Sequence, residues 1–151
     1  MTASDSRAMR RALELAADAS AASEIPVGAV VLDAEGRIIA EGRNHREATH
    51  DPTGHAEIAA LRAAAASVGS WNLDGHTLVV TLEPCIMCAG AILQARIARV
   101  VFGAWDDKAG AAGSMYDVLR DRRLPYRAEV VGGVEADAAT ALLRSFFEQR
   151  R

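Results

Sequence analysis

The feature that most constrains this chain is a pair of short motifs, His-Ala-Glu at residues 55–57 and Pro-Cys-Ile-Met-Cys at residues 84–88. One imidazole and two thiolates supply three of the four ligands of a tetrahedral zinc ion, which leaves one position for water. Such an open position distinguishes a catalytic zinc site from a closed structural one. The glutamate stands two residues from the histidine, close enough to reach that water without being a ligand. The motifs therefore predict a zinc site built from His55, Cys85 and Cys88.

The two cysteines of the second motif are the only cysteines in the chain. Two cysteines so close in sequence make a poor disulfide staple, so they are typical of a metal site or a redox pair. A thioredoxin-like redox pair has no use for an upstream His-x-Glu motif, which favours the metal site. A purely structural zinc would need a fourth protein ligand, for which His45, His50 and His76 are candidates. This alternative stays open.

Size and composition indicate one domain over residues 1–151. Hydrophobic residues make up 50% of the chain and charged residues 25%, which is ordinary for a globular protein. No apolar run approaches about 18 residues, and the N-terminus has no apolar signal core, so we expect a cytoplasmic protein without a membrane span. The net charge of −3 argues weakly against nucleic acid, although arginines within 43–46, 120–123 and 144–151 could form a local basic surface.

Apolar periodicity and turn residues predict helices and strands that interleave, and hence an α/β layered domain. Residues 5–23 have helical spacing, with Ser4 or Asp5 as the cap. Residues 27–32 form an almost continuous apolar strand, which predicts burial on both faces, and an Asp-Ala-Glu-Gly turn pairs it with a strand at 37–43. Further strands are predicted at 77–82, 99–102 and 128–131, helices at 55–68, 85–95, 115–119 and 135–150, and loops at 44–54 and 103–113.

All the predicted zinc ligands fall at the starts of predicted helices. The His-x-Glu pair lies in the first turn of one helix, and Pro84 is suited to start the helix that carries both cysteines on one face. The positive end of a helix dipole stabilises thiolates and a negatively charged hydroxide. The placement of the motifs therefore favours a zinc site that activates water.

His-x-Glu followed by Pro-Cys-x-x-Cys is the signature of zinc-dependent nucleobase deaminases. Further segments resemble the bacterial tRNA-specific adenosine deaminases, which belong to the zinc-dependent cytidine/deoxycytidylate deaminase superfamily. The matching segments lie at residues 25–29, 44, 50–61, 81–91, 99–104, 106, 108, 110–114, 142–143 and 146–147, and the resemblance extends over about residues 6–151. The Gly-Ala-x-Asp, Gly-Ala-Ala-Gly-Ser and terminal Phe-Phe pieces point to the tRNA branch.

The resemblance implies a three-layer α/β/α sandwich with a central five-stranded mixed sheet flanked by helices. It also implies a homodimer, with one zinc ion per subunit, that hydrolyses the wobble adenosine of a tRNA anticodon loop to inosine. By the same resemblance, His55, Cys85 and Cys88 are the zinc ligands and Glu57 is the proton shuttle.

The resemblance further implies substrate contacts from Asn44, Ala56, Pro26, Val27, Asp106 and Phe147. Asn44 can offer a donor and an acceptor to the edge of a flipped base. Asp106 is expected to accept a hydrogen bond from a ribose hydroxyl, which would favour RNA over DNA. Trp105 stands where the family often has arginine, and is either a packing residue or a platform for base stacking. Trp71 is predicted to be a packing residue.

Two other functions stay open at this point. A deaminase of free guanine, cytosine or a nucleoside would share the zinc motif and would differ in the loops around Asn44 and Asp106 and in the Phe-Phe tail. A non-catalytic, zinc-stabilised binding module would tolerate the loss of Glu57.

Overall fold

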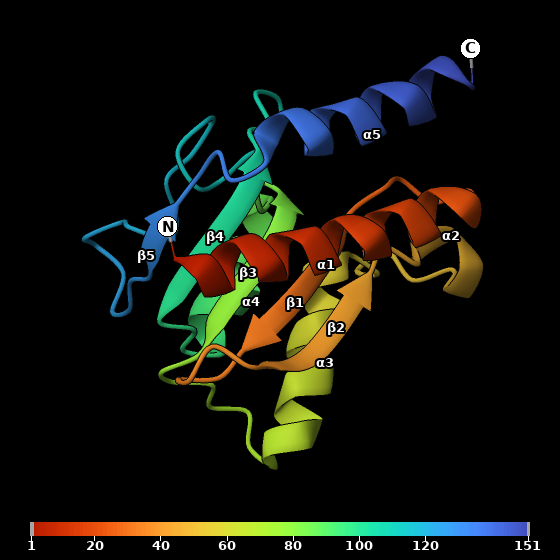
Figure 1. Ribbon diagram of the computed structural model, residues 1–151. Helices are drawn as coiled ribbons and strands as arrows, with labels where there is room; N and C mark the ends of the chain where they lie inside the picture. Colours follow the sequence, from red (N-terminus) through yellow and green to blue (C-terminus); the bar gives the residue numbers. More distant parts are fainter. Residues whose placement is uncertain (1, 151) are drawn as a thin grey trace.

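A five-stranded mixed sheet forms the centre of the structure, a computed structural model that describes residues 2–150 (Figure 1). Its strand order is β2-β1-β3-β4-β5. β1 pairs antiparallel with both β2 and β3, whereas β4 pairs parallel with both β3 and β5. The strands are β1 (Gly28–Leu32), β2 (Ile38–Arg43), β3 (Thr77–Leu82), β4 (Arg99–Ala104) and β5 (Glu129–Val131).

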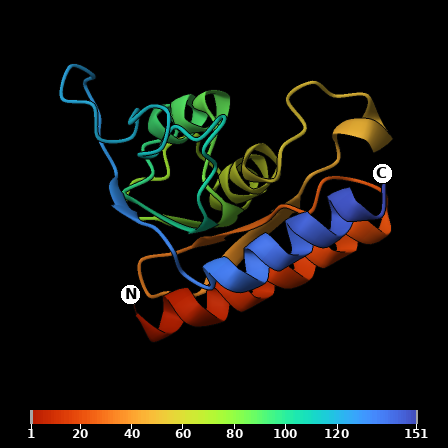
Figure 2. The ribbon, with the colours of Figure 1, turned by 90° about the horizontal axis from the view of Figure 1, so that it is seen from above.

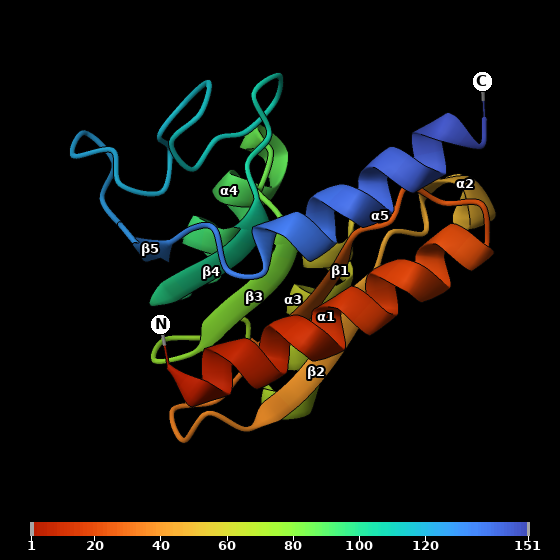
Figure 3. The same cartoon turned by 45° about the horizontal axis from the view of Figure 1, so that its top comes forward.

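Helices cover both faces of the sheet. On one face, α1 (Ala3–Ala21) and α5 (Ala136–Glu148) lie side by side, while α3 (Ala56–Val68) and α4 (Ile86–Gln94) cover the other (Figures 2 and 3). Each face has its own apolar core, and β1 contributes to both, because its successive side chains alternate between the two clusters. The predicted three-layer α/β/α sandwich and the two-sided burial of the first strand are therefore confirmed.

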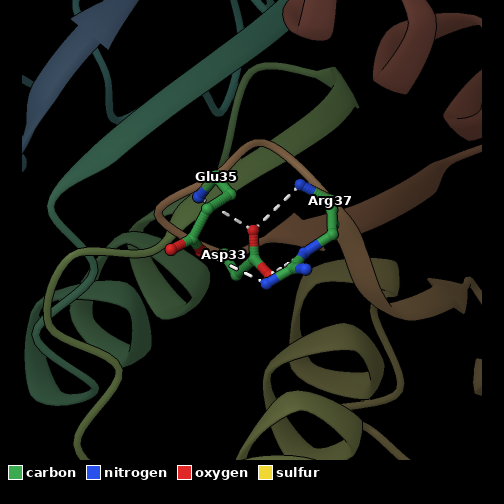
Figure 4. A network of polar contacts seen from close by, with 3 residues as sticks. All are labelled: Asp33, Glu35 and Arg37. Atoms are coloured by element: carbon green, nitrogen blue, oxygen red, sulfur yellow. Dashed lines mark hydrogen bonds and ion pairs between the residues drawn. The ribbon is translucent and has the colours of Figure 1, made fainter.

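The hairpin between β1 and β2 closes through the predicted Asp-Ala-Glu-Gly turn (Figure 4). Asp33 accepts hydrogen bonds of 2.9 Å from the backbone N–H groups of Glu35 and Arg37 and from the Arg37 guanidinium. The backbone N–H of Arg37 contributes most to lowering the pKa of Asp33. A short polar side chain that bonds to the backbone ahead of it is the usual way to fix such a turn.

The start of α1 differs from the prediction. The N-cap is Thr2, whose hydroxyl accepts from the N–H of Asp5, while the Asp5 carboxylate accepts from the N–H of Thr2. Neither Ser4 nor Asp5 is the cap. Asp5 instead closes the capping box and turns inward to a partly buried ion pair with Arg99 on β4, a partner distant in sequence.

The predicted helix at 115–119 is wrong. The segment folds back on the preceding turn. The N–H of Met115 bonds to the carbonyl of Gly110 and that of Val118 to the carbonyl of Ala111, so both bond to the turn and not within a helix. The predicted loop at 44–54 contains one short helix, α2 (Arg46–Thr49). The buried carboxylate of Glu24 accepts from two N–H groups at its start.

Gly42 on β2 determines how closely α3 approaches the sheet. A Cβ atom at this position would lie 2.5 Å from the carbonyl oxygen of Ala56 and 2.6 Å from the nitrogen of Ala60. Glycine therefore allows the first turn of α3 to pack directly on the strand backbone. None of the helices within residues 2–150 is long and apolar enough to cross a membrane.

Candidate active site and metal centre

Two helix starts hold the predicted zinc ligands. His55 is the N-cap of α3, Cys85 is the N-cap of α4, and Cys88 is buried in the first turn of α4. Neither cap residue uses its side chain to cap its helix. The ligand atoms are therefore free to face one another at the positive ends of two helix dipoles.

The three side chains form one compact cluster. The Nδ1 atom of His55 lies 3.6 Å from the sulfur of Cys85 and 3.5 Å from that of Cys88, and all three ligand atoms lie within 4.8 Å of one another. Tetrahedral zinc with ordinary Zn–N and Zn–S bonds would separate nitrogen from sulfur by about 3.6 Å. The spacing and the donor set therefore both fit a zinc ion.

No fourth protein ligand completes the cluster among residues 2–150. The ring of His45 bonds to the Thr49 hydroxyl, and the ring of His76 faces the backbone carbonyls of Leu73 and Asp74. His50 does not join the cluster either. The geometry therefore supports a zinc site with a free coordination position for water. It argues against the four-ligand structural site that the sequence had left as an alternative.

Hydrogen-bond contacts link the three ligand groups. The hydrogen bond from Cys88 lowers the pKa of the Cys85 thiol to about 4, and the same bond together with burial raises the pKa of Cys88. The hydrogen bond with Cys85 raises the pKa of His55. Anionic sulfur next to an imidazole is the soft, negatively charged donor set that zinc prefers.

Glu57 lies beside the cluster in the first turn of α3 and is only 4% exposed. Burial raises the pKa of its carboxyl group to about 7, and the neighbouring Cys85 adds to this effect. Its carboxylate is not part of the ligand cluster. Glu57 is thus a buried, titratable group next to the metal position.

A cavity of about 200 Å³ opens onto the cluster. It is lined by Ile25, Val27, Asn44, Arg46, His55, Ala56, Glu57, Leu82, Glu83, Cys85, Asp106 and Ala109. Most of the predicted substrate contacts are therefore brought together from distant parts of the chain. Pro26 is buried and does not line the cavity, and Phe147 lies outside it.

Asn44 lines this cavity, and two hydrogen bonds hold its side chain amide. Its amide nitrogen donates to the carbonyl of Ile25 at 3.2 Å, and its amide oxygen accepts from the N–H of Arg46 at 3.1 Å. A carboxamide has a second N–H and a second lone pair. The fixed amide therefore keeps one donor and one acceptor for a ligand.

Phe147 lines a neighbouring cavity of about 390 Å³ and is 50% exposed. Ile25, Asn44 and Arg46 line both cavities. The two hollows are therefore adjacent, and a ligand larger than one base could extend from one into the other.

Trp105 packs against Phe102 in a T-shaped arrangement, with ring centroids 5.6 Å apart, and 54% of the residue is exposed. A packing contact is therefore present, and the role in base stacking stays a prediction. Trp71 is 63% exposed and lies against the guanidinium of Arg96, 5.2 Å from its ring centroid, so the contact it makes is at the surface and not in the core.

Comparison with known proteins agrees with this geometry. Residues 2–104 match the cytidine and deoxycytidylate deaminase zinc-binding region. A tRNA-specific adenosine deaminase of Haemophilus influenzae is 50% identical over 97% of this chain and 85% of its own length. The chain belongs to the tRNA-specific adenosine deaminase family.

Solved structures of deaminases share the fold. A tRNA:A34 deaminase, studied for A-to-I editing at the wobble position of transfer RNA, superimposes with a TM-score of 0.87 and 39% identity over 91% of this chain and 99% of the other. A guanine deaminase from Nitrosomonas europaea gives a TM-score of 0.79 at 31% identity, over 93% of this chain and 83% of the other. The deaminase fold thus accommodates more than one base.

Sequence reasoning missed one functional candidate in this deaminase, Glu83. Burial alone would raise the pKa of its carboxyl group, but hydrogen bonds from Ser114, Asp106 and Ala112 outweigh burial and lower it. The sequence did contain a signal for this residue, because Glu83 stands directly between an apolar strand and the Pro-Cys motif. A charged side chain at such a buried position needs hydrogen-bond partners.

We predict that His55→Ala loses the zinc ion, because the two thiolates alone supply only two of the four ligands of a tetrahedral site. Elemental analysis of the purified protein should fall from about one zinc per chain to nearly none. His76→Ala is the matched control and should keep its zinc, because the His76 ring bonds to the local backbone. A His55→Ala protein with full zinc content would contradict the assignment.

Proposed function

We propose that this protein hydrolyses the wobble adenosine of a tRNA anticodon to inosine. The observation that carries the proposal is the cluster of His55, Cys85 and Cys88 beside the buried Glu57, at a cavity that is also lined by a fixed carboxamide. The similarity to tRNA-specific adenosine deaminases supplies the substrate. A tRNA substrate also agrees with the cytoplasmic location predicted from the sequence.

Zinc held by His55, Cys85 and Cys88 would supply Lewis acidity, lowering the pKa of a coordinated water from 15.7 toward about 7. Glu57 accepts a proton from the attacking water and delivers it to N1 of the adenine ring. The water oxygen adds to C6. Glu57, unprotonated again after the transfer to N1, takes up the second proton from the new C6 hydroxyl and passes it to the amino group, which leaves as ammonia as the C6 carbonyl forms. One carboxylate serves as base and acid because its proton returns within the cycle.

The cavity residues orient the base for this attack. The free donor and acceptor of the Asn44 amide face a base edge, and Val27 and Ala56 supply apolar lining. An anticodon loop is single-stranded, so removing the wobble base from its stack costs a few kcal/mol at most. Arg46 and Phe147 line the adjacent cavity, where the flanking phosphate and nucleotide would lie.

Deamination of free guanine is the second candidate, because a guanine deaminase shares the fold. The adjacent cavity that contains Phe147 favours the larger substrate, since a free base would leave this cavity unused. A non-catalytic binding module has no role for a buried carboxylate beside an open metal position.

We predict that the protein forms inosine and ammonia from a tRNA with a wobble adenosine, and not from free adenosine, guanine or cytosine. Glu57→Gln should keep its zinc but lose about 10²–10⁴-fold in turnover, because the proton shuttle is gone. The exposed Glu14→Gln on α1 is the control and should behave like the wild type. Turnover of free guanine without turnover of tRNA would contradict the proposed substrate. A Glu57→Gln protein with wild-type turnover would contradict the proposed mechanism.

We further propose that Asp106 selects RNA by accepting a hydrogen bond from the ribose 2′-hydroxyl. Asp106 lines the cavity, and its Oδ1 already accepts from the N–H groups of Lys108 and Ala109, which fixes the side chain. The second carboxylate oxygen is then presented to the sugar.

We predict that Asp106→Asn narrows the preference for an RNA stem-loop over the same stem-loop with a deoxyadenosine target. Asparagine keeps an oxygen for the Lys108 and Ala109 bonds, so the change isolates the outer oxygen. The measurement is the ratio of kcat/KM on the two substrates. An unchanged ratio would refute the role of Asp106.

We propose that a second copy of the chain covers the groove between α3 and α4, a surface that supports the homodimer implied by the resemblance. This groove of about 460 Å³ is lined mostly by apolar side chains, including Ile58, Leu61, Trp71 and Ala91. Exposed apolar surface of this kind marks an interaction site.

We predict that the protein has twice its chain mass in light scattering, and that Ala65→Arg in the groove shifts it to a monomer. Ala17→Arg, on the exposed side of α1, is the matched control and should remain dimeric. A wild-type protein that is monomeric at micromolar concentration would overturn this part of the proposal.

A further inference from the structure

We infer that Glu83 is a positioning residue for the deamination, holding the loop that carries Asp106 against the start of α4. This inference rests on the proposed function. Glu83 follows β3 directly and precedes Pro84 and the metal ligand Cys85, so it links the sheet, the metal site and the loop at one point.

The carboxylate of Glu83 is only 2% exposed and is surrounded by one loop, residues 106–114. One oxygen accepts from the N–H of Asp106 at 3.0 Å and from the hydroxyl of Ser114. The other accepts from the N–H groups of Ala112 and Ser114, each at 3.0 Å. Both ends of the loop are therefore tied to a single side chain.

Gly110 makes this wrapping possible. A Cβ atom at Gly110 would lie 2.4 Å from the carboxylate carbon of Glu83, too close for any side chain. Ala111 donates its N–H to the carbonyl of Pro84 at 2.8 Å, so the loop also bonds to the backbone beside Cys85. The Gly-Ala-Ala-Gly-Ser segment of the family resemblance thus has a physical task, which is to enclose the Glu83 carboxylate.

No ion pair to Glu83 occurs within residues 2–150, so its charge is balanced by loop N–H and O–H groups alone. A carboxylate has two acceptor oxygens and no donor, and here both oxygens are used twice. Glutamine would place an NH₂ group against N–H donors on one side. The loop conformation therefore depends on an acceptor-only side chain at this position.

Glu83 borders the cavity, yet both of its oxygens are occupied by the loop. Its effect on the reaction should therefore pass through Asp106, whose N–H it fixes. A residue that acts through another shows a non-additive double-mutant cycle with it. A purely structural residue would instead lower stability without this coupling.

The experiment is a cycle of wild type, Glu83→Gln, Asp106→Ala and the double variant, assayed on a stem-loop with a wobble adenosine. We expect Glu83→Gln to keep its zinc and lose at least about tenfold in kcat/KM, in line with measured coupling between contacting residues. In the Asp106→Ala background, Glu83→Gln should lower kcat/KM by less than about threefold. Additive penalties, or loss of zinc from Glu83→Gln, would overturn the inference.

Asp5→Asn is the matched control for lost stability, because Asp5 is an equally buried carboxylate on the opposite helical layer. It should lower the melting temperature without changing kcat/KM. If it lowers kcat/KM as Glu83→Gln does, general destabilisation is the explanation and the inference fails. If Glu83→Gln does not fold, Ser114→Ala is the milder variant, because it removes only one of the four donors to the Glu83 carboxylate. It should also lower kcat/KM.

A second readout does not depend on activity. The chain has two tryptophans, so in a Trp71→Phe background the fluorescence reports on Trp105 alone, next to Asp106. Glu83→Gln should increase quenching of Trp105 by acrylamide, and Asp5→Asn should not. Unchanged quenching overturns the positioning of the loop, whereas absence of inosine with the wild type overturns only the proposed function.

Discussion

The meeting of two helix starts is the constraint on which the rest of this structure depends. His55 opens α3 and Cys85 opens α4, and their ligand atoms must lie within a few ångströms of one another for any metal to bind. The parallel and antiparallel strands of one sheet bring the two helices to the same face. Gly42 then lets α3 approach the sheet closely enough to align its first turn. A bulkier residue at Gly42 would move one ligand away from the other two.

Two buried glutamates flank the metal position, and their surroundings differ in a way that matches their proposed roles. Glu57 borders the cavity with its carboxylate outside the ligand set, and burial raises its pKa. Glu83 accepts four hydrogen bonds from one loop, and these bonds overcome burial and lower its pKa. The first is placed to exchange a proton, and the second keeps its charge and fixes a loop. Burial alone does not determine the behaviour of a carboxylate, because its hydrogen-bond partners decide which form is stable.

The sequence predicted the regular elements well because their signals are local. The unbroken apolar run of β1 marked a strand buried on both faces, and the glycine after α3 marked its end in a left-handed turn. The errors arose where a distant partner decides the conformation. Asp5 looks like a cap from its neighbours alone, but Arg99 on β4 draws its side chain inward. Residues 115–119 were expected to be helical, yet the N–H groups of Met115 and Val118 bond to the turn at 110–111.

The sequence by itself predicted the zinc ligands and the adjacent glutamate, because motif spacing indicates which side chains a metal needs, and the resemblance of its segments indicated the family. Only the tertiary structure decided what surrounds them. It excluded His45, His50 and His76 from the metal cluster, joined Asn44 and Asp106 at one cavity, and revealed Glu83 as the anchor of a loop. The physical reason is that a ligand motif acts within a few residues, whereas a cavity and a buried charge depend on groups that only the folded chain brings together.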